Sequence, residues 1–194
     1  MNSSPQCARC KLKRCQAGKD YFEYEQKARV FYEDTELIKL HRAATAVEGR
    51  YYCKENRLKE VILFSKEMGY SRLGLAFCVG LSNEARVIEE ILSKYFEVTS
   101  VCCKVCGIDK KDYDLEQIDA SRKEYMCNPA AQAGLMNKAN TEFNIICGLC
   151  VGHDAIFTKC SEAPVSTLIA KDRTLAHNPA GAIYCQYVTR QLEN

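Results

Sequence analysis

Thirteen cysteines occur among the 194 residues, and four of them occupy positions at which a metal could be bound. Cys78, Cys103 and Cys150 lie at the ends of short apolar segments typical of buried strands, and Cys127 directly precedes the helix-start signal Asn128-Pro129. Parallel strands lie about 4.8 Å apart, and ligands bind beyond their carboxyl ends. We therefore expect these four thiolates to converge on one centre.

Four thiolates favour a soft or borderline metal, which means zinc or an iron–sulfur cluster. Zinc sites usually contain two local pairs of closely spaced ligands, whereas these cysteines are spread over about 70 residues on different elements. We favour an iron–sulfur cluster of the 4Fe-4S type and keep zinc as the alternative. Because Cys127 precedes a helix, the positive end of the helix dipole would stabilise an anionic cluster there.

A second candidate centre lies at the N-terminus, where Cys7, Cys10 and Cys15 form a C-x2-C-x4-C pattern. Such spacing can surround one metal ion and is shared by zinc and iron–sulfur sites. The fourth ligand would come from Cys53, Cys160, Cys185 or His41. We expect residues 1–20 to form a cysteine knuckle and residues 21–194 to form a single metal-binding domain.

Polar side chains that follow the predicted strands could take part in chemistry at the same edge. His153 could ligate a metal, donate a hydrogen bond to a cluster sulfur or act as a general acid, and a half-buried histidine without such a role is equally compatible with the pattern. Lys171 and Arg173 could bind an anionic substrate or balance cluster charge, although charged residues are common in loops. His177 and Lys104 are weaker candidates of the same kind.

The remaining cysteines have no assigned centre. Strand alternation places Cys102 on the face of the sheet opposite Cys103. Cys147 and Cys185 lie in apolar segments, where a thiol can be a small buried core residue. The others are Cys53, Cys106 and Cys160.

Composition and charge argue against several classes of protein. Hydrophobic residues make up 47% and charged residues 27% of the chain, which is ordinary for a globular protein. A net charge of +2 provides no basic field for nucleic acid. No apolar run reaches the roughly 18 residues of a transmembrane helix, and no signal-peptide pattern is present. We expect a cytoplasmic protein with reduced thiols, whose partner is a redox protein or a small anionic ligand.

The hydrophobic pattern alternates between strands and helices over most of the chain. Strands are predicted at 72–78, 96–103, 143–149 and 164–170, and helices at 82–95, 128–140, 153–160 and from 178 onwards. This alternation predicts an α/β fold with about four parallel strands and helices on both faces. The polar stretch 104–125 is ambiguous, with a short helix near Leu115 as one interpretation.

A helical pair is predicted ahead of the sheet, within residues 21–70. Asp34 is expected to cap the first helix, and Asn56 to cap the second, which ends at Gly69. Together with the sheet, these elements must position the cysteines.

Six segments carry a resemblance to a known family: GLAFCVGLSNEA, VCCKVCGIDK, MCNPAAQAGLMN, NIICGLCVGHDAIF, APVSTLIAKDR and HNPAGAIY. They resemble an uncharacterised, cysteine-rich prokaryotic family, a domain of unknown function whose members are usually labelled metal-binding proteins. The resemblance implies metal binding in an anaerobe and supplies no reaction. It implies Cys78, Cys103, Cys127 and Cys150 as ligands. This chain departs from the pattern by extra cysteines, among them Cys53, Cys106, Cys147 and Cys160.

The sequence therefore predicts a metal-binding protein with one or two thiolate-ligated centres that serve electron transfer or redox and sulfur chemistry. One alternative is a zinc-binding structural or interaction module. Another is an enzyme with an open metal site that acts on a small anionic substrate through His153, Lys171 or Arg173. The chain lacks the Walker, GxGxxG, HExxH and GxSxG motifs, so nothing favours nucleotide hydrolysis, dinucleotide binding or serine hydrolysis.

Overall fold

The computed structural model describes residues 5–12 and 14–192 and divides into two compact units, Met1–Arg50 and Tyr51–Asn194. The first unit holds two 3-10 helices, η1 (Cys7–Arg9) and η2 (Arg14–Ala17), followed by α1 (Glu25–Phe31) and nearly all of α2 (Thr35–Tyr51). The predicted separation of residues 1–20 from the remainder of the chain stays a prediction.

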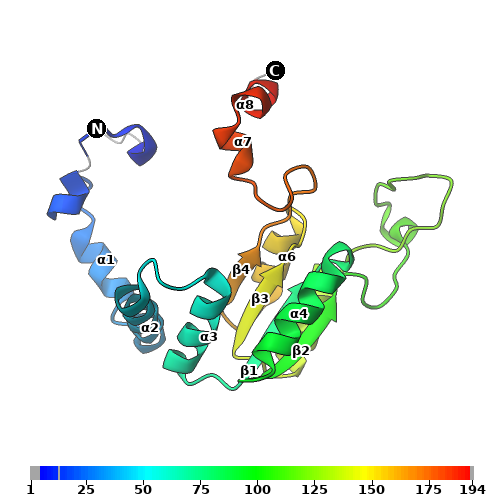
Figure 1. The fold of residues 1–194 in the computed structure, drawn as a ribbon, viewed down its shortest axis with the longest axis horizontal. Helices are drawn as coiled ribbons and strands as arrows, with labels where there is room; N and C mark the ends of the chain where they lie inside the picture. Colours follow the sequence, from blue (N-terminus) through cyan, green and yellow to red (C-terminus); the bar gives the residue numbers. More distant parts are fainter. Residues whose placement is uncertain (1–4, 13, 193–194) are drawn as a thin grey trace. The chain divides into compact units, whose positions relative to one another are not determined.

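The second unit contains the sheet and the helices around it (Figure 1). Its elements are α3 (Arg57–Met68), β1 (Arg72–Phe77), η3 (Val79–Leu81), α4 (Ser82–Leu92), β2 (Glu97–Cys102), η4 (Lys110–Tyr113), α5 (Pro129–Lys138), β3 (Phe143–Cys147), α6 (His153–Cys160), β4 (Val165–Ile169), α7 (Gly181–Tyr184) and α8 (Gln186–Leu192).

The four strands form a parallel sheet, as the sequence pattern predicts, and their order in the sheet is β2-β1-β3-β4. Phe77 of β1 is paired with Cys102 of β2 on one side and with Cys147 of β3 on the other. The residues that follow these strands therefore meet at one edge of the sheet. This edge is the one at which the sequence places the candidate ligands.

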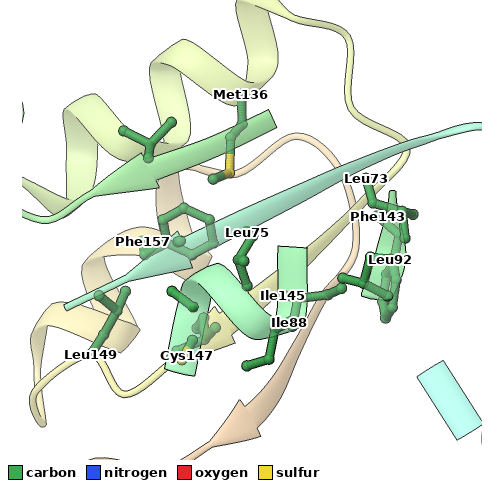
Figure 2. Packing of buried hydrophobic residues seen from close by; sticks show 14 of the residues in the cluster. Leu73, Leu75, Ile88, Leu92, Met136, Phe143, Ile145, Cys147, Leu149 and Phe157 are labelled. Atoms are coloured by element: carbon green, nitrogen blue, oxygen red, sulfur yellow. The ribbon is translucent and has the colours of Figure 1, made fainter. Parts of the chain in front are cut away.

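Helices cover both faces of the sheet. Gly74 and Asn144 are partners in neighbouring strands, and a Cβ atom on Gly74 would lie 2.6 Å from Sδ of Met136 in α5. Phe143 points to the opposite face, where its ring lies 5.2 Å from that of Phe64 in α3. Figure 2 shows Leu92 of α4 beside Phe143, so α3 and α4 share that face.

The core between these layers is formed by large apolar side chains (Figure 2). Leu75, Ile145, Met136 and Phe157 are each fully buried. Complete burial of such a side chain contributes roughly 1.5–3 kcal/mol, so the core fixes the positions of the strand ends. Cys147 is also fully buried in this cluster, which confirms its interpretation as a core residue.

Helix caps occur where the sequence predicts them. The side chains of Asp34, Asn56 and Asn128 accept hydrogen bonds from backbone N–H groups in the first turns of α2, α3 and α5. Pro129 occupies the first position of α5, and Gly69 ends α3 with a left-handed φ of 77°. The cap at Asn128 fixes the start of α5 directly after Cys127.

The C-terminal segment differs from the single helix that the sequence predicts. The chain forms α7 and α8, separated by Cys185 in an extended conformation, and Cys185 is exposed, so its interpretation as a core residue is wrong. The hydroxyl of Thr189 donates to the carbonyl of Ala182 at 2.8 Å and to that of Cys185 at 3.1 Å, which partly satisfies the backbone at the break. The segment is rich in β-branched and aromatic residues and buries no side chain, so packing does not enforce a continuous helix.

The polar stretch between β2 and α5 is a long loop held together by its own contacts. Asp109 and Tyr125 form an isolated antiparallel bridge, and Lys110 pairs with Glu124 at 2.6 Å. Its short helix is η4, which ends before Leu115. No helix in the described part of the chain has the length and apolar character needed to cross a membrane.

Candidate metal centre

The four predicted ligands lie at the carboxyl edge of the sheet. Cys78 and Cys103 directly follow β1 and β2, Cys150 lies shortly after β3, and Cys127 precedes the cap of α5. The sulfur atoms of Cys103 and Cys127 are 3.8 Å apart, and Cys103 also contributes a side-chain hydrogen bond to Cys78. The fold therefore brings thiols from different elements together, as expected for parallel strands.

Backbone N–H groups of η3 face two of these sulfurs. The N–H of Val79 donates to Sγ of Cys103 at 3.3 Å, and Gly80 supplies a backbone hydrogen bond to Cys78. A Cβ atom on Gly80 would lie 3.9 Å from Sγ of Cys78 and 3.3 Å from Nζ of Lys171. Because Gly80 has no side chain, it leaves room beside Cys78 and Lys171. The successive N–H groups of Val79 and Gly80 are suited to stabilise negatively charged thiolates.

Cationic side chains contact the same thiols. Nζ of Lys171 lies 3.1 Å from Sγ of Cys78, and a guanidinium nitrogen of Arg173 lies 3.1 Å from Sγ of Cys150. The sequence candidates Lys171 and Arg173 therefore lie at the predicted edge, and each approaches a cysteine. His153 begins α6, and its charge acts on Cys127.

The Cys103–Cys127 pair is electrostatically asymmetric. The hydrogen bond with Cys103 is the largest influence on Cys127 and, with the nearby Lys104 and His153, lowers the pKa of the Cys127 thiol to about 5. The same hydrogen bond, together with burial, raises the pKa of Cys103 well above its usual range. Without a metal, Cys127 is therefore a thiolate at neutral pH and Cys103 remains a neutral thiol.

Cys78 and Cys147 are both buried, but their surroundings shift their pKa values in opposite directions. Burial raises the pKa of Cys78, but the hydrogen bonds from Gly80 and Lys171 outweigh burial and leave the pKa below its usual value. Burial raises the pKa of Cys147 to about 11, because no comparable donor offsets it. The edge thus favours a thiolate at Cys78, whereas the core keeps Cys147 protonated.

The spacing of possible ligands in the described residues does not match a site for a single ion. Among residues 5–12 and 14–192, no three His, Cys, Asp or Glu side chains are grouped closely enough to hold one metal ion. The four thiols instead share an edge, where Cys103 contacts Cys127 and Cys78, and Arg173 contacts Cys150.

The N-terminal trio belongs to the first unit. Cys7, Cys10 and Cys15 are all exposed, and the N–H of Cys10 donates to the carbonyl of Cys7 at 3.1 Å in a tight turn. His41, a candidate fourth ligand in this unit, lies 3.1 Å from the hydroxyl of Thr45. A second metal centre here stays a prediction.

The other cysteines lie in varied surroundings. Cys102 is partly buried against the core. The exposed ones are Cys53, Cys106, Cys160 and Cys185.

Gln132 is a site-supporting residue that the sequence patterns do not reveal. Its side-chain nitrogen donates to the carbonyls of Phe77 at 3.2 Å and Val101 at 2.6 Å, and its side chain is completely buried. Phe77 directly precedes Cys78, and Val101 lies two residues before Cys103. Gln132 therefore joins the ends of β1 and β2. The helix has only a weak pattern of apolar and polar residues, so the sequence does not indicate that Gln132 is buried or that it bonds to the strands.

Comparison with known proteins places these features in a family. A family model described as a protein of unknown function, DUF1847, matches residues 15–168. The chain belongs to this family. The matched DUF1847 region contains Cys78, Cys103, Cys127 and Cys150, and it ends before Lys171. The resemblance to an uncharacterised family is thereby confirmed.

A full-length relative of this DUF1847 protein occurs in Methanocaldococcus jannaschii. The relative is the uncharacterized protein MJ0455, which is 49% identical over 187 residues, covering 96% of this chain and 97% of the relative. No solved structure matches the chain.

Proposed function

We propose that this DUF1847 protein binds an iron–sulfur cluster of the 4Fe-4S type through Cys78, Cys103, Cys127 and Cys150. The observation that carries the proposal is the meeting of these four thiols, from four separate parts of the chain, at one edge of the parallel sheet. When bound, such a cluster supplies reversible one-electron transfer or a site for redox and sulfur chemistry.

The donor set and its surroundings suit this group. Each thiolate of a cluster binds a different iron atom, so the ligands can be spread more widely than those of one ion. Cys78 and Cys103 are only 6% and 2% exposed, which would limit the access of solvent to a cluster. The cations Lys171, Arg173 and Lys104 would balance the negative charge that four thiolates bring.

The proposal also includes a second metal centre, a cytoplasmic location and a redox partner. Cys7, Cys10 and Cys15 would hold part of a second metal site, completed by a ligand from elsewhere. A protein with these reduced thiols belongs in the cytoplasm of an anaerobe and would exchange electrons with a redox partner protein. We do not propose nucleic acid or a membrane as partner.

Metal analysis of the full chain prepared without oxygen tests the proposal. We expect a brown protein with a broad visible absorption band and matching amounts of iron and acid-labile sulfide. Serine at position 78, 103, 127 or 150 should lower both contents, whereas Cys106→Ser, which changes an exposed cysteine outside both candidate ligand sets, should not. Joint replacement of Cys7, Cys10 and Cys15 should remove only the metal of the second centre. A colourless protein that contains zinc alone would contradict the cluster.

A zinc-binding structural or interaction module is the second candidate, and one distance favours it. Zn–S bonds of about 2.3 Å at a tetrahedral metal place two ligand sulfurs about 3.8 Å apart. This separation equals the 3.8 Å between the sulfurs of Cys103 and Cys127. A zinc module would keep its metal in air and would unfold when a chelator removes it.

The open-site enzyme has less support than these two. Lys171 and Arg173 each contact a cysteine sulfur in the structure, so both charges are directed at the thiols.

A further inference from the structure

The loop after β4 is organised so that two cations reach the cysteine edge. Lys171 and Arg173 flank Asp172, whose carboxylate accepts hydrogen bonds from the N–H and hydroxyl of Thr174 at 3.0 and 2.9 Å. The N–H of Asp172 donates to Nδ1 of His177 at 3.1 Å, and the N–H of His177 returns a hydrogen bond to the carbonyl of Asp172 at 2.8 Å. We call residues 170–177 the cation loop.

The cation loop directs its charges at sulfur. Lys171 contacts Cys78 and Arg173 contacts Cys150, each at 3.1 Å. Within the described residues, neither cation forms an ion pair with a carboxylate, although Asp172 lies between them in the sequence. The charge of Arg173 also acts on Cys78 and Cys127, so its influence extends across the proposed centre.

We propose that Lys171 and Arg173 are tuning residues that raise the reduction potential of the centre. The inference rests on the proposed function, since it requires Cys78 and Cys150 to be cluster ligands. Net charge and hydrogen bonds to the sulfurs are two determinants of cluster potential. Uptake of one electron makes the centre more negative, so a nearby cation stabilises the reduced form more than the oxidised form. Each cation therefore favours reduction.

The test compares midpoint potentials of the loaded, full-length protein. Lys171→Met and Arg173→Met remove one charge each, and Lys171→Arg and Arg173→Lys keep it. Matched controls are Lys138→Met, at the exposed far end of α5, and Arg86→Met, on the surface of α4. Anaerobic titration with dithionite and mediator dyes gives the potential, and iron and sulfide contents are measured in parallel.

We expect a more negative midpoint potential in each Met variant and a larger shift in the double variant. The charge-keeping variants and both controls should remain near the wild-type value. Loss of the cluster from the Met variants but not from Lys171→Arg and Arg173→Lys would also support the proposal, because charge would then be what retains the anionic centre.

Three results would overturn the inference, and they separate it from the proposed function. Unchanged potentials in both Met variants, with iron and sulfide at wild-type levels, would refute the tuning role alone. Equal cluster loss in the Met and charge-keeping variants would show that side-chain shape matters and not charge. A wild-type protein without iron and sulfide would refute the proposed function and this inference together.

Discussion

The sulfur of Cys103 lies 3.8 Å from that of Cys127, although 24 positions separate the two residues in the sequence. The contact depends on two different elements, because one cysteine follows β2 and the other precedes α5. It leaves Cys127 with a pKa of about 5 and Cys103 with a raised pKa, so in the protein without metal the pair holds one thiolate and one thiol.

Alkylation of the metal-free protein should therefore distinguish these two cysteines. Iodoacetamide is expected to modify Cys127 at a rate that rises through about pH 5, whereas an ordinary thiol gains reactivity near pH 8.5. Cys103 should react little at neutral pH. Peptide mass spectrometry after timed labelling measures both rates. Cys103→Ser should move the profile of Cys127 to higher pH, and an unmoved profile would mean that the hydrogen bond is not the cause.

The loop between β2 and α5 should loosen in acid because of Glu124. Its carboxylate pairs with Lys110 and accepts from the N–H groups of Ile118 and Asp119, which together lower its pKa to about 2. The pKa in the folded protein lies below the unfolded value of about 4.3, so the stabilisation is complete above that pH and is lost as pH falls toward 2.

Amide exchange of Ile118 and Asp119 measures this effect directly. Protection should fall between about pH 4.3 and 2 after correction for intrinsic exchange. Glu124→Gln should show low protection at every pH, and Glu116→Gln serves as the control in the same loop. Protection that stays constant in the wild-type protein down to pH 2 would contradict the prediction.

Gly74 and Gly134 should respond in opposite directions to the same substitution. A Cβ on Gly74 would meet Oδ1 of Asn144 and lie 2.6 Å from Sδ of Met136, so Gly74→Ala should cost about 1–3 kcal/mol. Gly134 lies within α5, and apart from its chain neighbours and the backbone of its own helix no atom lies within 4 Å of a Cβ there, so Gly134→Ala should stabilise by about 0.5–1 kcal/mol. Urea unfolding gives both values, and equal effects would argue against the close contact at Gly74.

Cys147 should behave as a core residue and Cys78 as a ligand. Cys147→Ala removes a small, fully buried group and should lower the free energy of unfolding by about 1 kcal/mol while iron content is retained. Cys78→Ala should remove iron. Chemical denaturation and metal analysis of both variants make the comparison, and iron loss from Cys147→Ala would place Cys147 in the centre.

Local chemistry explains why much of this fold is predictable. Asn56 and Asn128 cap helices through their own side chains, and Gly69 adopts a conformation that other residues resist, so each acts within a few residues. The strand ends at Cys78 and Cys103 follow from apolar segments that must be buried. Parallel pairing then places both thiols at one edge without further information.

Other contacts could not be predicted because they join distant residues. The approach of Lys171 to Cys78 depends on how the cation loop folds, and no local pattern fixes that path. The capping of strand carbonyls by Gln132 depends on the angle of α5 against the sheet. At Cys185 the apolar pattern predicts burial, but the surrounding segment buries nothing, so the expected helix is interrupted.

The strand order β2-β1-β3-β4 also determines when the cysteine edge can form during folding. β1 lies between β2 and β3, and each neighbour reaches it only after an intervening helix has crossed the sheet. Metal knuckles with ligands close in sequence can organise a chain early, but thiols from three strand ends and a helix start meet only after long-range pairing is complete. Retention of metal would therefore report that the sheet has formed completely. A chain in which β3 did not pair with β1 would not retain the metal.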